Sequence, residues 1–168
     1  MVIKMATELT DMQSEIDRMV DTYSDMVYKL AYAQVRKKND ADDIYQEVFL
    51  RYIRKKPKFD NADNEKAWFI RVTVNCCKNF WNSPFRKHTQ SLEDDIVFQS
   101  EEESYLKPLV DQLPEAYRAV VHLFYYEDMP VSQISKALGR KEATVRVQLM
   151  RSRQMLRDIL EGDESFVG

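Results

Sequence analysis

The stretch PVSQISKALGRKEATVRVQLMRSR, residues 130–153, decides the fold of the carboxy-terminal part of this 168-residue chain. Apolar residues recur at helical spacing before Gly139, which can adopt a left-handed turn without steric cost. A longer helix follows, with Val145 and Leu149 facing inward. A short helix, a glycine turn and a second helix with a polar outer face together predict a helix-turn-helix.

This segment carries a local excess of positive charge, although the formal charge of the whole chain is −3. Residues 136–157 contain seven basic side chains and the single acid Glu142. Arginine can form a bidentate pair of hydrogen bonds with guanine, and glutamine can form one with adenine. Valine can contact a thymine methyl. The residues expected to meet a major groove are Thr144, Arg146, Val147, Gln148 and Arg151. The residues expected to contact phosphates are Arg140, Lys141 and Arg153. A plain helical hairpin with a solvated basic face is the alternative that this segment alone leaves open.

Helical periodicity extends through the rest of the chain, which has only 3 glycines and 5 prolines and is 44% hydrophobic. Amphipathic patterns predict helices over residues 15–36 and 65–81, with a further helix between them that is capped by Asn39 or Asp40 and ends before Pro57. Residues 58–64 are expected to form a polar loop. We therefore predict an all-α fold in which three helices enclose the first core.

A charge-rich segment separates this part from the helix-turn-helix. Residues 83–104 hold six acids, two basic residues and few apolar ones, which is typical of a flexible linker. Beyond it, helices are expected over residues 106–113, 114–124, 131–138 and 141–160, the second starting at Pro114. The predicted organisation is two small helical domains, residues 1–82 and 105–168, joined by the linker 83–104.

Several classes of function are not indicated. The adjacent pair Cys76 and Cys77 suits neither a disulfide framework nor paired zinc ligands, so packing is the expected role of both. The acids around Asp42 lack the glycine and the later glutamate of a calcium loop, and neither histidine belongs to a triad-like arrangement. We expect no catalysis, no metal and no cofactor. No run reaches signal-peptide or membrane-span length, so a cytoplasmic protein without membrane insertion is expected.

Three motifs carry a family resemblance: DADDIYQEVF at residues 40–49, AWFIRVTVNCCKN at residues 67–79, and a carboxy-terminal block from LPE at 113–115 through EATVR at 142–146 to RSR at 151–153. In this order they resemble the extracytoplasmic-function sigma factors of bacteria over nearly the whole chain. The resemblance implies that the first domain is the three-helix sigma region 2 and the second is the four-helix region 4. It also implies that the chain directs core RNA polymerase to promoters.

The resemblance assigns roles to residues. It implies binding to the clamp helices of the largest polymerase subunit by Asp43, Gln46, Glu47, Phe49 and Leu50. It implies that a base flipped from the downstream promoter element enters a pocket formed by loop residues 59–64, among them Phe59, Asn61, Ala62, Asp63 and Asn64, together with Asn75. From their charge, the residues expected to hold phosphates nearby are Lys56, Lys58, Arg71 and Lys78. Region 4 would read the upstream element and meet the polymerase flap. A free monomer, an anti-sigma factor as partner, and association with the nucleoid within the holoenzyme are also implied.

The residues themselves support and qualify these roles. Asp43, Gln46 and Glu47 lie on one helical turn and suit a partner's cations, although acids in a first turn also complement the helix dipole. Asp63 and Glu65 would repel phosphate if they faced it. Two rivals stay open: a helix-turn-helix regulator that acts without polymerase and dimerises through its first domain, and a sigma-like adaptor that binds only protein.

Overall fold

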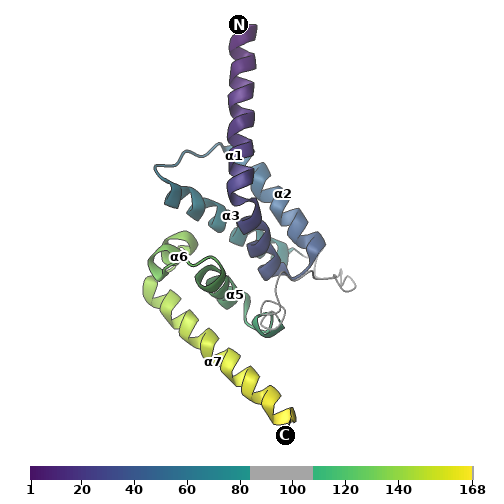
Figure 1. The fold of residues 1–168 in the computed structure, drawn as a ribbon, viewed down its shortest axis with the longest axis vertical. Helices are drawn as coiled ribbons and strands as arrows, with labels where there is room; N and C mark the ends of the chain where they lie inside the picture. Colours follow the sequence, from purple (N-terminus) through teal and green to yellow (C-terminus); the bar gives the residue numbers. More distant parts are fainter. Residues whose placement is uncertain (84–107, 168) are drawn as a thin grey trace.

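The computed structural model describes residues 1–83 and 108–167, the last five as backbone only, and every regular element in these ranges is helical (Figure 1). The expected all-α class is therefore confirmed. The first domain contains α1 (Val2–Val35), α2 (Lys38–Lys55) and α3 (Ala62–Asn82). The second contains α5 (Glu115–Val121), the π-helical turn η1 (His122–Tyr126), α6 (Val131–Leu138) and α7 (Glu142–Val167).

The three helices of the first domain enclose an aromatic core. Phe69 of α3 is fully buried at its centre and stacks on Tyr23 of α1 at 4.5 Å between ring centroids. Tyr52 and Phe49 of α2 pack against the same ring at 5.5 and 5.6 Å. Such offset and tilted aromatic pairs add to the apolar area they bury, so this cluster fixes how the three helices lie relative to one another.

The helix boundaries differ from the sequence prediction at three places. α1 begins at Val2 rather than near residue 15. α3 begins at Ala62 because the Asn61 side chain accepts a hydrogen bond from the Asn64 amide at 2.8 Å, so residues 62–64 of the expected polar loop are helical. The expected cap of α2 is wrong: the helix starts at Lys38, and its N-cap Lys37 makes no side-chain capping bond.

In the second domain, the expected start of a helix at Pro114 is confirmed, because this proline is the N-cap of α5. Gly139 ends α6 with φ 66° and ψ 35°, a conformation that favours glycine. The predicted linker, apart from Ser83, and the first part of the helix expected over 106–113 lie outside the described residues. Leu109 and Leu113, from the described end of that segment, are buried.

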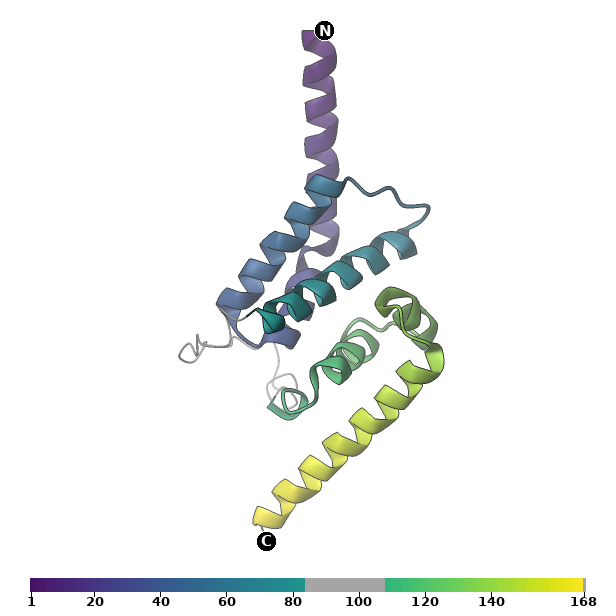
Figure 2. The ribbon, with the colours of Figure 1, turned by 180° about the vertical axis from the view of Figure 1, so that it is seen from behind.

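The two domains pack against each other. α6 lies beside α3, while α5 and η1 contact α1, and one hydrophobic cluster runs through both domains (Figure 2). The buried guanidinium of Arg118 links them by donating to the carbonyls of Leu113 at 2.7 Å and of Gln34 at 3.0 Å. The Gln34 side-chain nitrogen donates to the Glu115 carbonyl at 3.2 Å, and its side-chain oxygen accepts from the Ala119 amide at 2.9 Å.

This shared packing follows from the apolar character of α3 on two sides. Cys76 lies near Arg51 of α2, whereas Cys77 lies near Arg118 of the second domain. Both thiols are buried, and burial raises the pKa of each. The expected packing role of the two cysteines is confirmed, and their two directions show that α3 is the central layer between α2 and the second domain.

Candidate nucleic-acid interfaces

The outer face of α7 carries the residues expected to meet a major groove. Thr144, Arg146, Val147 and Arg151 are exposed, and Gln148 is half-buried. Their burial contrasts with that of the residues that hold the helix in place, Val145, Leu149 and Ser152. Four of the five predicted groove residues therefore lie on an open surface, which is the arrangement that a helix-turn-helix needs.

The turn before α7 fixes the angle between the two helices. The amides of Gly139 and Arg140 both donate to the Ser135 carbonyl of α6, and the Ser135 hydroxyl donates to the Arg140 carbonyl. These bonds satisfy backbone groups at the end of α6 that would otherwise lack partners within the helix. The turn is therefore a tight one held by three hydrogen bonds, and α7 departs from it in a defined direction.

The three residues expected at phosphates are placed differently from one another. Lys141 is exposed, and Arg153 donates to the Tyr125 hydroxyl at 2.6 Å. Arg140 is half-buried and donates both to the Ala116 carbonyl at 3.1 Å and to the Gln148 side chain at 3.0 Å. Burial lowers the pKa of Arg140 from its ordinary value. Arg140 thus positions Gln148, a link between two predicted site residues that the sequence did not show.

A second polar face lies along α3. Asn64, Arg71, Asn75 and Lys78 are spaced by seven, four and three residues, so they lie on one side of the helix. Asn75 and Lys78 are exposed. The structure thus brings together four of the ten residues that were expected at the downstream element.

α6 of the second domain contacts the other half of this face. The Lys136 ammonium donates to the Asn64 side-chain oxygen at 2.6 Å. The Arg71 guanidinium donates to the carbonyls of Lys136 and Ala137 at 2.7 and 3.2 Å. We call these three hydrogen bonds the α3–α6 clasp. Asn64 and Arg71 are therefore engaged by the protein itself in this arrangement.

The remaining downstream residues surround the connection between α2 and α3. Lys56 and Lys58 are exposed there, as are Asn61, Ala62 and Asp63 at the start of α3. Phe59 is half-buried and packs edge-on against Trp68 at 6.0 Å, so its ring belongs to the edge of the core. The connection is shorter than predicted, because Ala62 and Asp63 are already helical.

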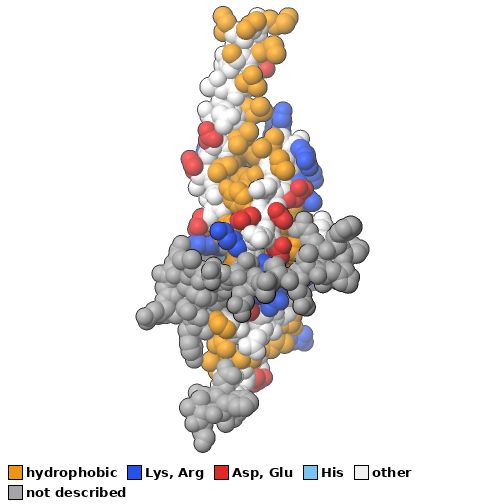
Figure 3. Space-filling model, turned by 90° about the vertical axis from the view of Figure 1, so that its right-hand side faces the viewer, with side chains coloured by type: hydrophobic (Ala, Val, Ile, Leu, Met, Phe, Trp, Pro, Cys, Tyr) orange, Lys and Arg blue, Asp and Glu red, His pale blue; other side chains and the backbone are white. Residues whose placement is uncertain are grey.

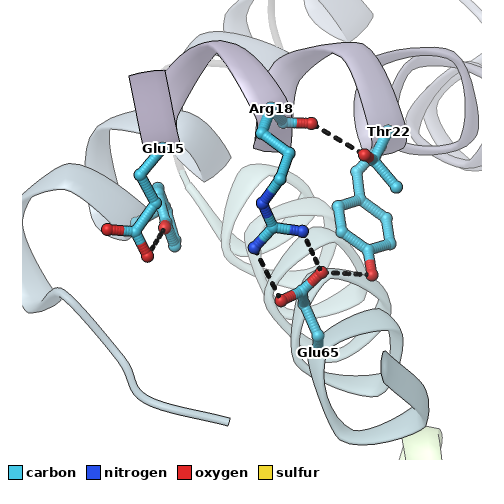
Figure 4. Close-up of polar contacts among 6 residues, drawn as sticks. Glu15, Arg18, Thr22 and Glu65 are labelled. Atoms are coloured by element: carbon cyan, nitrogen blue, oxygen red, sulfur yellow. Dashed lines mark hydrogen bonds and ion pairs between the residues drawn. The ribbon is translucent and has the colours of Figure 1, made fainter. Parts of the chain in front are cut away.

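Glu65 does not oppose a nucleic acid, because its side chain turns inward (Figure 4). Its carboxylate accepts a hydrogen bond from Tyr23 at 2.8 Å and pairs with Arg18 at 3.4 Å. Burial, together with this carboxylate, raises the pKa of the Tyr23 phenol. The contact fastens the first turn of α3 to α1. It also removes one of the two acids whose repulsion of phosphate the sequence had suggested.

The face of α2 carries the residues expected to bind polymerase. Asp43, Gln46 and Leu50 are exposed, and Glu47 is half-buried and pairs with Arg51 at 3.0 Å. Phe49 is only 8% exposed, so its side chain lies in the core rather than on this surface.

Beside this face lies a hollow between α1 and α2 that sequence analysis missed. It has a volume of about 550 Å³ and is lined by Val20, Asp21, Ser24, Asp25, Tyr28, Asp42 and Tyr45. Three carboxylates and two tyrosines make it acidic and partly apolar. The spacing of Val20, Ser24 and Tyr28 was the signal that could have found it, since residues four apart share a helix face.

Two absences apply to the described residues. No helix among them is long and apolar enough to cross a membrane. No group of three histidine, cysteine or acidic side chains in the described ranges could hold a metal ion.

Comparison with known proteins connects the two domains to one family. Residues 19–84 match the model described as Sigma-70 region 2, and residues 105–156 match Sigma-70 region 4. The ECF RNA polymerase sigma factor SigE of Mycolicibacterium smegmatis is 31% identical over 86% of this chain, which spans 61% of that relative's length. RNA polymerase sigma factor SigV of Bacillus subtilis is 26% identical over 77% of this chain and 81% of its own.

Solved structures share the fold. CnrH, in complex with the cytosolic domain of CnrY, superposes with a TM-score of 0.69 at 20% identity and 90% coverage of both chains. The sigma factor RpoE of Bartonella quintana, crystallised with the anti-sigma factor NepR, gives a TM-score of 0.64 at 17% identity, covering 90% of this chain and 97% of its own. With both regions matched in order and the helical arrangement shared, this chain belongs to the extracytoplasmic-function sigma factors of the sigma-70 family.

Proposed function

We propose that this chain recruits core RNA polymerase to a set of promoters, binding polymerase through its first domain and upstream promoter DNA through its second. The observation that carries the proposal is the exposed polar and basic face of α7, which follows a hydrogen-bonded glycine turn in the region 4 match. A helix held by its inner face and open on its outer face is the form in which proteins enter a major groove.

For polymerase, the proposed contact is the α2 face together with the acidic hollow. Asp43 and Gln46 lie on the exposed side of α2, and Asp21 and Asp42 line the hollow beside it. Carboxylates that flank an apolar depression suit a partner helix with arginine or lysine around an apolar centre. Phe49 supports this surface from below, because its ring packs against Tyr45 at 4.9 Å.

For DNA, the proposed division of labour follows the exposure of side chains. Arg146 and Arg151 extend from α7 and can contact base edges, while Lys141 and Arg153 meet phosphates. Asn75 and Lys78 on α3 are proposed to contact the separated strand of the downstream element, where an amide can pair with an unstacked base.

The α3–α6 clasp implies that the two domains separate before the whole α3 face meets DNA. Asn64 and Arg71 cannot reach a strand while they bond to α6. Each of these bonds has a net worth of only about 0.5–1.5 kcal/mol in water. Contacts with polymerase and promoter would replace these bonds and the apolar packing between the two domains. We therefore propose that the present arrangement is the closed form of a protein that opens on assembly.

An anti-sigma factor is the further proposed partner. Among the structures of the same fold, RpoE was solved with the anti-sigma factor NepR, and CnrH was solved with the cytosolic domain of CnrY. We propose that the hollow and the exposed α2 face form the surface that binds it. We further propose a cytoplasmic protein that is monomeric when free and joins the nucleoid within the holoenzyme.

The test is run-off transcription with purified core polymerase and genomic promoter fragments, with and without the chain. The proposal predicts start sites that depend on the added protein, and gel filtration should show a one-to-one complex with core enzyme. A stable homodimer with no affinity for core polymerase would point instead to a regulator that acts alone. Binding to core enzyme without any new start site would favour a protein-binding adaptor.

A further inference from the structure

The amino-terminal part of α1 projects beyond the helical bundle (Figure 1). All residues from 1 to 15 are exposed, and we call residues 2–15 the arm. At 1.5 Å per residue the arm is roughly 20 Å long. The region 2 match begins only at residue 19, so the arm lies outside the part of the chain that the family model describes.

Large apolar residues follow a strict coiled-coil spacing along α1, alternating three and four residues apart. We call this set the seam: Val2, Met5, Leu9, Met12, Ile16, Met19, Tyr23, Met26 and Leu30. A 3–4 alternation sustained over four heptads is the pattern by which one helix presents a continuous stripe to another. Figure 3 shows apolar side chains running along the projecting arm.

The two halves of the seam have opposite environments. Met19, Tyr23, Met26 and Leu30 are between 0 and 6% exposed, because α2 and α3 cover them. In the arm the exposed fractions are 81% for Val2, 58% for Met5, 60% for Leu9 and 37% for Met12. The seam residues from Met19 onward thus belong to the core, whereas the seam residues of the arm have no helix of the described chain packed against them.

The charges beside the exposed half are acidic. Glu8 and Glu15 occupy the positions that flank the seam on one side, and Ala6 and Gln13 those on the other. Lys4 is the only basic residue before Arg18, which is itself paired with Glu65. Further along α1 the acidic hollow continues this character. The arm therefore offers an apolar stripe with a negative border.

We infer that the arm is a docking surface for a single amphipathic helix of a partner protein, one with an apolar seam bordered by lysine or arginine. The charge border favours this occupant over a second copy of this chain in antiparallel orientation. In an antiparallel pair of two copies of this chain, glutamates would face glutamates across the seam, a repulsive arrangement. An anionic membrane surface would likewise repel the acidic border. This inference does not rest on the proposed transcription function.

The probe is a synthetic peptide of three heptads with leucine at the seam positions and lysine at the flanking positions, measured by fluorescence anisotropy against the full chain. A twin peptide has glutamate at the flanking positions, and a third has the lysine peptide's composition in scrambled order. We expect the lysine peptide to bind at least about tenfold more tightly than the glutamate twin at low salt, with the difference shrinking as salt is added.

Matched variants locate the binding on the seam. Leu9→Gln removes one exposed apolar side chain and should weaken binding at least about tenfold, because the partner helix would bury this leucine. Thr7→Gln makes a change on the opposite, exposed side of the arm and should leave the affinity unaltered. Circular dichroism should show both variants fully helical, because neither side chain is packed.

Three outcomes would overturn the inference. Equal binding of the lysine and glutamate peptides would remove the role of the acidic border. Unchanged binding by Leu9→Gln would place the peptide elsewhere. Self-association of the parent chain in sedimentation velocity that Leu9→Gln abolishes would show that the occupant is a second copy of this chain.

Discussion

The polar faces of α3 and α7 are both proposed to contact nucleic acid, yet only one of them is open. On α7, Arg146 and Arg151 are exposed, and no residue of the first domain bonds to them among the described contacts. On α3, Asn64 and Arg71 bond to α6 while Asn75 and Lys78 stay exposed. The comparison teaches that packing between domains, rather than the composition of a face, decides which DNA surface is available.

The physical reason lies at the end of α6. The last carbonyls of any helix lack partners within it and carry partial negative charge. In this short helix, two of them accept hydrogen bonds from the Arg71 guanidinium of the other domain. A cation that suits a phosphate also suits these carbonyls, so α6 occupies part of the α3 face that is proposed to contact a strand of DNA.

The largest expected effect comes from locking the two domains together. In the double variant Asn64→Cys, Lys136→Cys, a short bismaleimide should link α3 to α6. The two parent side chains meet there, with Lys136 Nζ 2.6 Å from Asn64 Oδ1. We expect the linked protein to lose promoter-dependent run-off transcription, because the α3 face can no longer open. The unlinked double variant and each linker-treated single variant serve as controls, and Cys76 and Cys77 are buried away from the reagent. Full activity of the linked protein would mean that the domains need not separate.

The next largest effect concerns the open face. Replacing both Arg146 and Arg151 by alanine should weaken binding of the holoenzyme to promoter duplex by about 1–3 kcal/mol for each arginine that contacts a base. Arg157→Ala, a change at another exposed arginine of the same helix, is the matched control and should have little effect. Filter binding or anisotropy with duplex DNA measures this. If the control weakens binding as much as the double variant does, α7 supplies only general charge.

Acid should loosen the closed arrangement through His122, which lies in η1 where the second domain contacts α1. Burial, with a smaller contribution from Lys29, lowers the pKa of His122 to about 4. A state that exposes this histidine binds a proton more readily, near its ordinary pKa of about 6.5. The closed form is therefore fully stable above that pH, and it should lose stability as the pH falls from about 6.5 towards 4, by up to about 3 kcal/mol.

Urea unfolding at a series of pH values tests this expectation. The urea midpoint of His122→Gln should change less with pH than that of the parent protein. Part of the loss is offset, because burial raises the pKa of the neighbouring Glu127 carboxyl, and a group with a raised pKa in the fold stabilises it as pH falls. A parent protein with the same pH response as His122→Gln would contradict the assignment.

The smallest effect is that of a single clasp bond. Lys136→Met keeps the length of the side chain but removes its hydrogen bond to Asn64. We expect the closed form to lose about 1 kcal/mol, a roughly fivefold shift towards the open form. Hydrogen exchange at the amides around Asn64 and Arg71 measures this shift, and Lys141→Met is a control that removes an exposed lysine outside the clasp. Equal protection in parent and variant would show that the bond contributes nothing.

Much of the candidate site followed from local patterns. The glycine turn, the inner residues Val145 and Leu149, and the exposure of Arg146 and Arg151 are all consequences of helical spacing, which sequence displays directly. The wrong cap of α2 and the start predicted too late for α3 belong to helix ends, where one side-chain hydrogen bond shifts the boundary. The acidic hollow was missed because its lining comes from two helices whose relative position no single pattern records.

The sequence by itself determined the all-helical class, the order of the two matched regions and the outward polar face of α7, because each depends on residues close together in the chain. Only the tertiary structure decided that Arg71 caps α6 and that Arg118 joins the domains through Gln34. It also decided that the seam of α1 is buried from Met19 onward and exposed in the arm. These contacts join residues far apart in sequence. Their formation depends on the summed burial and hydrogen bonding of whole helices, which local spacing does not encode.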